Sequence, residues 1–189
     1  MKKQIILSII ALLTVSISII AQSNQNPTKG DDQFYLGLKY YQANNFSKAT
    51  YWWLKAAQQG VVAAQYNLAM CYDNGQGVTR DYYEANKWYR KAAENGYSEA
   101  QVTLGARYMS GKGITRDPAQ AVKWLTKAAE QGNADGQYNL ALCYGRGDGV
   151  AKNEVLANYW LKKAADQGHA EAKRMMGGSS KIKVSVPLH

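Results

Sequence analysis

Few side chains in this sequence of 189 residues combine a reactive type with a spacing that would support catalysis or metal binding. The two cysteines, Cys71 and Cys143, are far apart, and the two histidines, His169 and His189, do not form a metal-binding motif such as HExxH. There is also no Gly-x-Ser-x-Gly elbow for a serine nucleophile and no phosphate-binding loop after a strand. The sequence therefore predicts no catalytic residue, no metal site and no cofactor, and it favours a binding protein over an enzyme.

The residues that do stand out recur at a constant interval of 36 positions, which indicates an internal repeat. The recurring types are glycine, tryptophan and tyrosine, as in Gly60, Gly96, Gly132 and Gly168, in Trp52, Trp88, Trp124 and Trp160, and in Tyr72, Tyr108 and Tyr144. Any binding side chain must therefore be positioned by the elements of its own repeat unit and by the packing of that unit against its neighbours.

Each unit is predicted to be a hairpin of two helices. Ala100, Leu104 and Tyr108 have the four-residue spacing of one face of a first helix, called helix A below. After a glycine-containing turn, Asp117 is the expected N-cap of a second helix, called helix B, with a proline at its first position. Helix B is expected to end at Gly132, in the left-handed conformation that glycine favours.

The unit resembles the Sel1-like repeat in the segments AQYNL, GQGV and KAAENG within residues 64–96. The resemblance implies an all-α fold, an α-solenoid of antiparallel helix hairpins that forms a right-handed superhelix like that of tetratricopeptide repeats. It also implies participation in protein complexes. We expect units at about residues 32–60, 64–96, 100–132 and 136–168, followed by a capping helix at 169–176.

The two cysteines occupy the same position in units that are two repeats apart. One hairpin adds about 10 Å to a helical stack, so their Cα atoms are expected about 20 Å apart, whereas a disulfide needs them within about 7 Å. We therefore expect free thiols. This departs from the cysteine-rich Sel1-like branch, in which paired cysteines staple each hairpin and for which β-lactam binding or hydrolysis has been proposed. A β-lactam-directed or cell-wall-directed enzyme is the alternative function.

A mostly apolar row of side chains is expected on the face of helix A opposite its core stripe. At about 100° per residue, Tyr66 and Met70 lie nearly opposite the core position Leu68. In solenoids of this kind the A helices line the concave surface, so the row resembles a peptide-binding groove; burial by neighbouring hairpins is the alternative. Asn67 and Asn139, one position further on, are candidates for hydrogen bonds to an extended peptide. The predicted partner-binding residues are Phe34, Tyr66, Asn67, Met70, Val102, Tyr138, Asn139 and Leu142.

Charge adds a preference for the kind of partner. The chain has 23 basic and 14 acidic side chains, a formal net charge of +9, and helix B carries lysines such as Lys123 and Lys127. A basic surface favours an acidic protein or peptide as partner. If the chain is exported, nucleic acid is the least favoured polyanionic partner. Arg146-Gly147-Asp148 spells an integrin-type tripeptide, but it arises from the turn of the repeat and no adhesive role is expected.

The first 21 residues have the organisation of a secretory signal peptide. Lys2 and Lys3 precede an apolar run that ends at Ala21, and a polar segment follows. Cleavage after Ala21 is predicted, and a retained membrane anchor is the alternative because about 18 apolar residues can just span a bilayer. The expected location is the periplasm or the exterior of a bacterial cell, with membrane contact only if the segment is retained.

Two further segments fall outside the repeats. Residues 22–31 are expected to be a polar linker, and residues 177–189 a flexible tail. The repeats and the signal segment together predict an exported adaptor. It is expected to bind a protein or peptide partner in the groove lined by the A helices.

Overall fold

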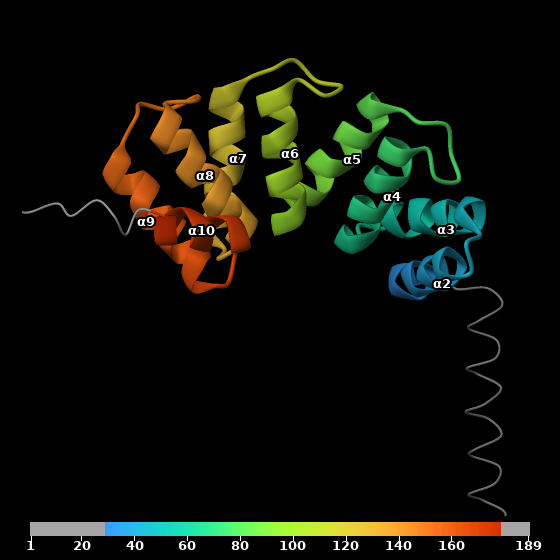
Figure 1. The fold of residues 1–189 in the computed structure, drawn as a ribbon. Helices are drawn as coiled ribbons and strands as arrows, with labels where there is room; N and C mark the ends of the chain where they lie inside the picture. Colours follow the sequence, from blue (N-terminus) through green and yellow to red (C-terminus); the bar gives the residue numbers. More distant parts are fainter. Residues whose placement is uncertain (1–28, 179–189) are drawn as a thin grey trace, which may run out of the picture. The chain divides into compact units, whose positions relative to one another are not determined.

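The computed structural model describes residues 29–178, and these residues form nine α-helices and no strand (Figure 1). The helices are α2 (Gly30–Gln42), α3 (Phe46–Gln58), α4 (Val62–Asn74), α5 (Tyr82–Glu94), α6 (Ser98–Ser110), α7 (Pro118–Glu130), α8 (Ala134–Arg146), α9 (Glu154–Asp166) and α10 (Ala170–Gly178). This confirms the predicted all-α helical repeat. Within the described range, none of the helices has the length and apolar character needed to span a bilayer.

The predicted signal segment and most of the predicted linker and tail lie outside the described residues. The first and last helices extend into the predicted linker and tail: α2 already begins at Gly30, and α10 ends at Gly178. Asp31 and Asp32 lie in the first turn of α2, where their negative charge interacts favourably with the helix dipole. The last residues of the expected linker are therefore the start of a helix.

The chain divides into two compact units, with the boundary between Asp81 and Tyr82. In the described residues the first unit contains α2 to α4 and the second contains α5 to α10. The A helices are α2, α4, α6, α8 and α10, and the B helices are α3, α5, α7 and α9. Within each unit every helix packs against the next one along the chain, and in the second unit α6 also contacts α8. The A helices α6 and α8 therefore lie side by side.

The helix starts are those that the capping residues predicted. Asp117 accepts a hydrogen bond from the backbone N–H of Gln120 at 3.0 Å, and Asn153 accepts one from Leu156 at 3.0 Å. These bonds satisfy N–H groups that have no partner inside the helix. They set the first residue of α7 and of α9, and thus the length of the loop between each A helix and its B helix.

The glycine-containing loop that joins α8 to α9 packs against the start of α7. Gly149 has a φ of +73°, and a Cβ at this position would overlap the carbonyl group of Pro118. Only glycine combines this backbone conformation with so close an approach. The contact fixes the loop, and with it the neighbouring residue Asp148, against the body of the second unit.

Small residues on the B helices allow close packing, with larger side chains between the helices. Ala85 and Ala121 are completely buried, and Trp88 and Trp124 are nearly so. In the first unit the repeat tryptophan, Trp52, is only half-buried, whereas the adjacent Trp53 is 3% exposed. The core position of the B helix thus includes the residue after the recurring tryptophan, which the 36-residue pattern did not reveal.

In α6 and α8 a buried glutamine ties the A helix to the B helices on both sides. In α8 the buried Gln137 donates to the carbonyl of Ala129 at 3.2 Å and accepts from Gln167 at 2.7 Å. In α6, Gln101 donates to the carbonyl of Ala93 at 3.1 Å and accepts from the glutamine that follows α7. A buried amide with both groups satisfied holds neighbouring helices in register.

Candidate partner-binding site

The eight residues predicted to bind a partner all lie on A helices and are all half-buried. Four of them line cavities: Asn67 and Met70 in the first unit, and Asn139 and Leu142 in the second. The other four are placed differently, as described below. At these four positions the predicted row therefore borders a cavity.

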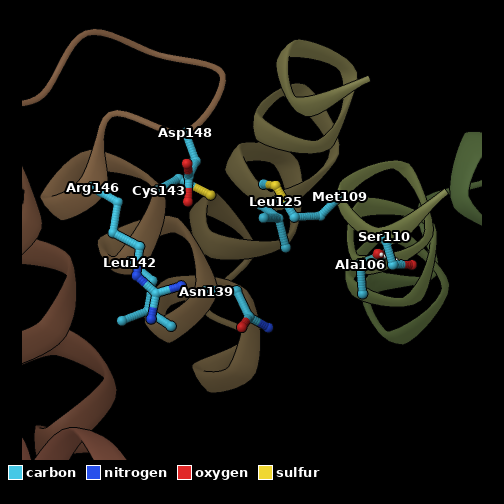
Figure 2. Close-up of a pocket in the computed structure, with 9 residues that line it drawn as sticks. All are labelled: Ala106, Met109, Ser110, Leu125, Asn139, Leu142, Cys143, Arg146 and Asp148. Atoms are coloured by element: carbon cyan, nitrogen blue, oxygen red, sulfur yellow. Dashed lines mark hydrogen bonds between the residues drawn. The ribbon is translucent and has the colours of Figure 1, made fainter. Parts of the chain in front are cut away.

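The larger cavity, called pocket 1 below, lies between α6 and α8 and has a volume of about 390 Å³ (Figure 2). Leu125 of α7 and Met109 of α6 form one wall, and Leu142 and Cys143 of α8 form the other. Polar and charged groups lie at its edge. The complete lining is Ala106, Met109, Ser110, Leu125, Asn139, Leu142, Cys143, Arg146 and Asp148.

The smaller cavity, called pocket 3 below, has a volume of about 210 Å³ and lies in the first unit among α2, α3 and α4. Every residue that lines it has a counterpart in pocket 1. The matched pairs, two repeats apart, are Leu38 and Ala106, Tyr41 and Met109, Trp53 and Leu125, Asn67 and Asn139, Met70 and Leu142, Cys71 and Cys143, and Gln76 and Asp148. The repeat therefore builds the same kind of cavity in both units, at the junction of two A helices and the B helix between them.

Tyr138 and Val102 contribute to packing between hairpins. The ring of Tyr138 stacks on His169, with 4.4 Å between the ring centroids, and also packs against the buried cluster of Leu161 and Ala172. Val102 packs against the cluster that contains Leu125. For these two positions the alternative of burial by a neighbouring hairpin fits the structure better than an open groove.

Phe34 and Tyr66 are half-buried but line neither pocket 1 nor pocket 3. The ring of Phe34 has an edge-to-face contact with Tyr35 at 5.5 Å. The aromatic residues of the predicted row thus line neither pocket, and the apolar walls of pocket 1 are aliphatic and sulfur-containing side chains.

Cys71 and Cys143 are both buried and form no disulfide, as their spacing predicted. Burial raises the pKa of the Cys71 thiol, against a smaller lowering by its hydrogen bond with Thr50. Burial and the nearby Asp148 carboxylate raise the pKa of the Cys143 thiol to about 11, while Arg146 lowers it. Both thiols are therefore protonated near neutral pH and add an apolar, unreactive surface to their pockets.

Arg107 occupies the position of these cysteines in the intervening repeat. Its guanidinium is buried and donates to the side-chain oxygen of Asn86 at 3.0 Å, and it lies 4.8 Å from the centroid of the Tyr89 ring. Asn86 in turn donates to the loop carbonyl of Lys112 at 3.0 Å. At this position the repeat holds a buried polar network in place of a thiol.

Sequence reasoning missed Arg146 and Asp148 as possible binding residues. Arg146 is the last residue of α8, and Asp148 lies in the loop two residues later. The equivalent positions hold Asn74 and Gln76 in the first full repeat, so a change from neutral to charged residues at the two positions was the available signal. In the described residues no group of histidine, cysteine, aspartate and glutamate side chains is placed to hold a metal ion.

The Sel1 repeat family matches the chain four times in succession, at residues 31–61, 62–97, 98–133 and 134–169. A search among curated proteins found no match. The four matches cover most of the chain and coincide with the helix pairs described above.

Several solved structures are similar to this chain. One is a protective antigen present in uropathogenic Escherichia coli strains that displays an SLR fold, with 38% identity over 87% of this chain and a TM-score of 0.78. A Sel1 repeat protein from Oxalobacter formigenes has 36% identity over 79% of the chain and a TM-score of 0.73. The chain spans 35% and 45% of these two proteins. Cysteine rich protein B of Helicobacter pylori has 27% identity over 65% of the chain, a TM-score of 0.51, and 93% of its own length covered.

Sel1 repeat proteins generally act as scaffolds for protein–protein interaction, and mainly without enzymatic activity. The four consecutive family matches, the nine helices of the described residues and the similarity to two solved Sel1 repeat structures at more than 35% identity all agree. The chain belongs to the Sel1 repeat family.

Proposed function

We propose that this protein is an exported adaptor that binds a protein or peptide partner on its A helices, and that pocket 3 of the first unit and pocket 1 of the second each receive an apolar side chain. The observation that carries the proposal is the recurrence of the same cavity at equivalent positions of the two units. A partner that contacts several repeats would use such a series of cavities.

The asparagines at the edges of the two pockets support binding to a peptide backbone. Asn67 and Asn139 are half-buried, and within the described part of the chain neither side-chain amide makes a hydrogen bond. The equivalent residue of the intervening repeat, Thr103, instead donates to the carbonyl of Glu99 in its own helix. An amide offers one acceptor and two donor hydrogens, which matches the alternating N–H and C=O groups of an extended chain.

Site-specific photo-crosslinking tests the binding face. A benzophenone amino acid in place of Leu142 or Met70 in the full-length chain is expected to crosslink to a partner protein in intact cells. The same amino acid in place of Tyr159, an exposed residue of α9 outside both pockets, is the matched control and is expected to give no product. Combined substitution of Asn67 and Asn139 by alanine should weaken the partner's affinity about tenfold, the cost of two hydrogen bonds. Crosslinks of equal yield at all three positions would contradict a binding site on the A helices.

Export rests on the signal segment, which lies outside the described residues. Removal of residues 1–21 would leave Gln22 as the first residue of the mature protein. We expect intact-mass spectrometry of the protein recovered from the cell envelope or the medium to give the mass of residues 22–189. Substitution of Ala21 by a bulky residue such as leucine should hinder this cleavage. Recovery of the wild-type protein from the cytoplasm with residues 1–21 still attached would refute the export proposal.

A further inference from the structure

Pocket 1 differs from pocket 3 in having a cation and an anion at its edge. Arg146 is exposed and Asp148 is half-buried, and both line the pocket. In pocket 3 the counterpart of Asp148 is the neutral Gln76, and no charged residue lines the cavity. The two pockets share an apolar floor, so the charges are a property of pocket 1 and not of the repeat.

Both charged side chains lie on the α8 side of the pocket. In Figure 2 the side chain of Arg146 extends along α8 toward Leu142, whereas Asp148 lies beside Cys143. No ion pair joins Arg146 and Asp148, although only one residue separates them in the sequence. The α8 wall of pocket 1 therefore carries two separate and opposite charges beside its apolar surface.

Neighbouring side chains leave both charges available. Glu154 lines a second cavity that also includes Arg146, but its carboxylate pairs with Lys152 at 3.0 Å. Within the described residues, Asp148 has no ion-pair partner, and only its backbone N–H is hydrogen-bonded, to the carbonyl of Cys143. The Gly149 contact with α7 holds the loop that carries Asp148, so the position of the Asp148 backbone relative to the pocket is set by packing.

The arrangement also bears on the Arg146-Gly147-Asp148 tripeptide. Gly147 is the residue after α8 and has a φ of +81°, so the three residues form a helix end and not the tip of an open loop. The charged side chains on either side of it border pocket 1.

We infer that pocket 1 selects a partner segment in which an apolar side chain lies between an acidic residue, which pairs with Arg146, and a basic residue, which pairs with Asp148. This rests on the proposed function and names the chemistry of the partner at one of its two pockets. Opposite charges at separate places along α8 fix the direction in which the segment runs, because the reversed segment would place like charges together. Pocket 3 has no such charges and would accept an apolar side chain in either direction.

An array of synthetic ten-residue peptides tests this inference with the full-length protein. Each peptide carries a central leucine, with glutamate on one side and lysine on the other at one to four residues from it, in both orders, and a matched set has glutamine at both places. Wild-type protein is expected to retain the best peptide of one order about tenfold more strongly than any peptide of the other order. It should retain the glutamine peptides at an intermediate level.

A charge-swapped variant provides the decisive comparison. Arg146→Glu combined with Asp148→Arg keeps the net charge and should invert the preferred order. The matched control, Lys162→Asp combined with Asp166→Lys, exchanges an exposed ion pair of α9 away from the pocket and should leave the preference unchanged. Circular dichroism of each variant establishes that its helices are intact.

The outcomes separate this inference from the proposed function. If leucine peptides bind and Asn139→Ala weakens them, but wild type retains both charge orders equally or the swapped variant keeps the wild-type order, selection by Arg146 and Asp148 is wrong while a peptide-binding face stands. If no peptide of any set is retained above a leucine-free control, the binding face itself is wrong, and this inference is wrong with it.

Discussion

Substitution of Gly149 by alanine is expected to lower the free energy of unfolding by about 3 kcal/mol, from the sum of backbone strain at a positive φ and steric overlap in a packed contact. The φ of +73° disfavours any residue with a Cβ, and the added methyl group would meet the carbonyl group of Pro118 and the backbone nitrogen of Ala119. Both neighbours are backbone atoms at the start of α7, so no side-chain rotation relieves the overlap. The loop between α8 and α9 would have to move away from α7.

Gly132→Ala is the matched control for this prediction. Gly132 has a φ of +88°, but a Cβ there would have no atom within 4 Å. It isolates the cost of the backbone conformation, which we expect to be about 1 kcal/mol. Urea unfolding followed by circular dichroism gives both values. Equal losses for the two variants would mean that the close contact between the loop and α7 contributes nothing to stability.

Substitution of Asn86 by valine is expected to lower the free energy of unfolding by a similar amount, about 3 kcal/mol, because it removes one partner of a buried charge. Asn86 accepts a hydrogen bond from Arg107 and donates one to the carbonyl of Lys112. Both Asn86 and Arg107 are at least nine-tenths buried, so water cannot replace the lost bonds. Valine is the residue at the equivalent position of the next repeat, Val122, and it fits the packing of the B helix.

A double-mutant cycle with Arg107→Met tests the physical reason. In the next repeat the same two positions hold Val122 and Cys143, so an apolar pair is compatible with the fold. With the charge removed, valine at position 86 no longer deprives a guanidinium of its acceptor. The double variant should therefore be more stable than the sum of the two single losses predicts, by about 2 kcal/mol or more. Additive losses would show that Asn86 and Arg107 contribute independently.

The helical repeat itself was predictable from the sequence because its signals are local. Asp117 and Asn153 cap their helices through residues three positions later, and Gly132 has the positive φ that ends a helix. Each of these signals acts within one turn of helix, so the sequence around it is sufficient. The same hairpin pattern then recurs every 36 residues. This recurrence removes the ambiguity in secondary structure that a single amphipathic segment would leave.

The candidate site was predictable only in part. The 100° rotation of an α-helix placed Asn67, Met70, Asn139 and Leu142 on one face, and these four do line the pockets. The same reasoning placed Tyr138 on that face, but its ring stacks on His169 of the last hairpin. Helical rotation gives the direction of a side chain, whereas its exposure depends on which other helix lies in that direction.

The sequence by itself determined the all-α repeat, the helix caps and the free state of the two cysteines, since each follows from neighbouring residues or from the repeat interval. Tertiary structure decided which half-buried residues border a cavity, and that Arg146 and Asp148 flank pocket 1. The physical reason is that pocket 1 is bounded by three helices and the loop after α8, and that loop is positioned by the contact of Gly149 with the start of α7. Contacts between residues from different repeats set the volume and the charge of the site, and no single repeat contains all of them.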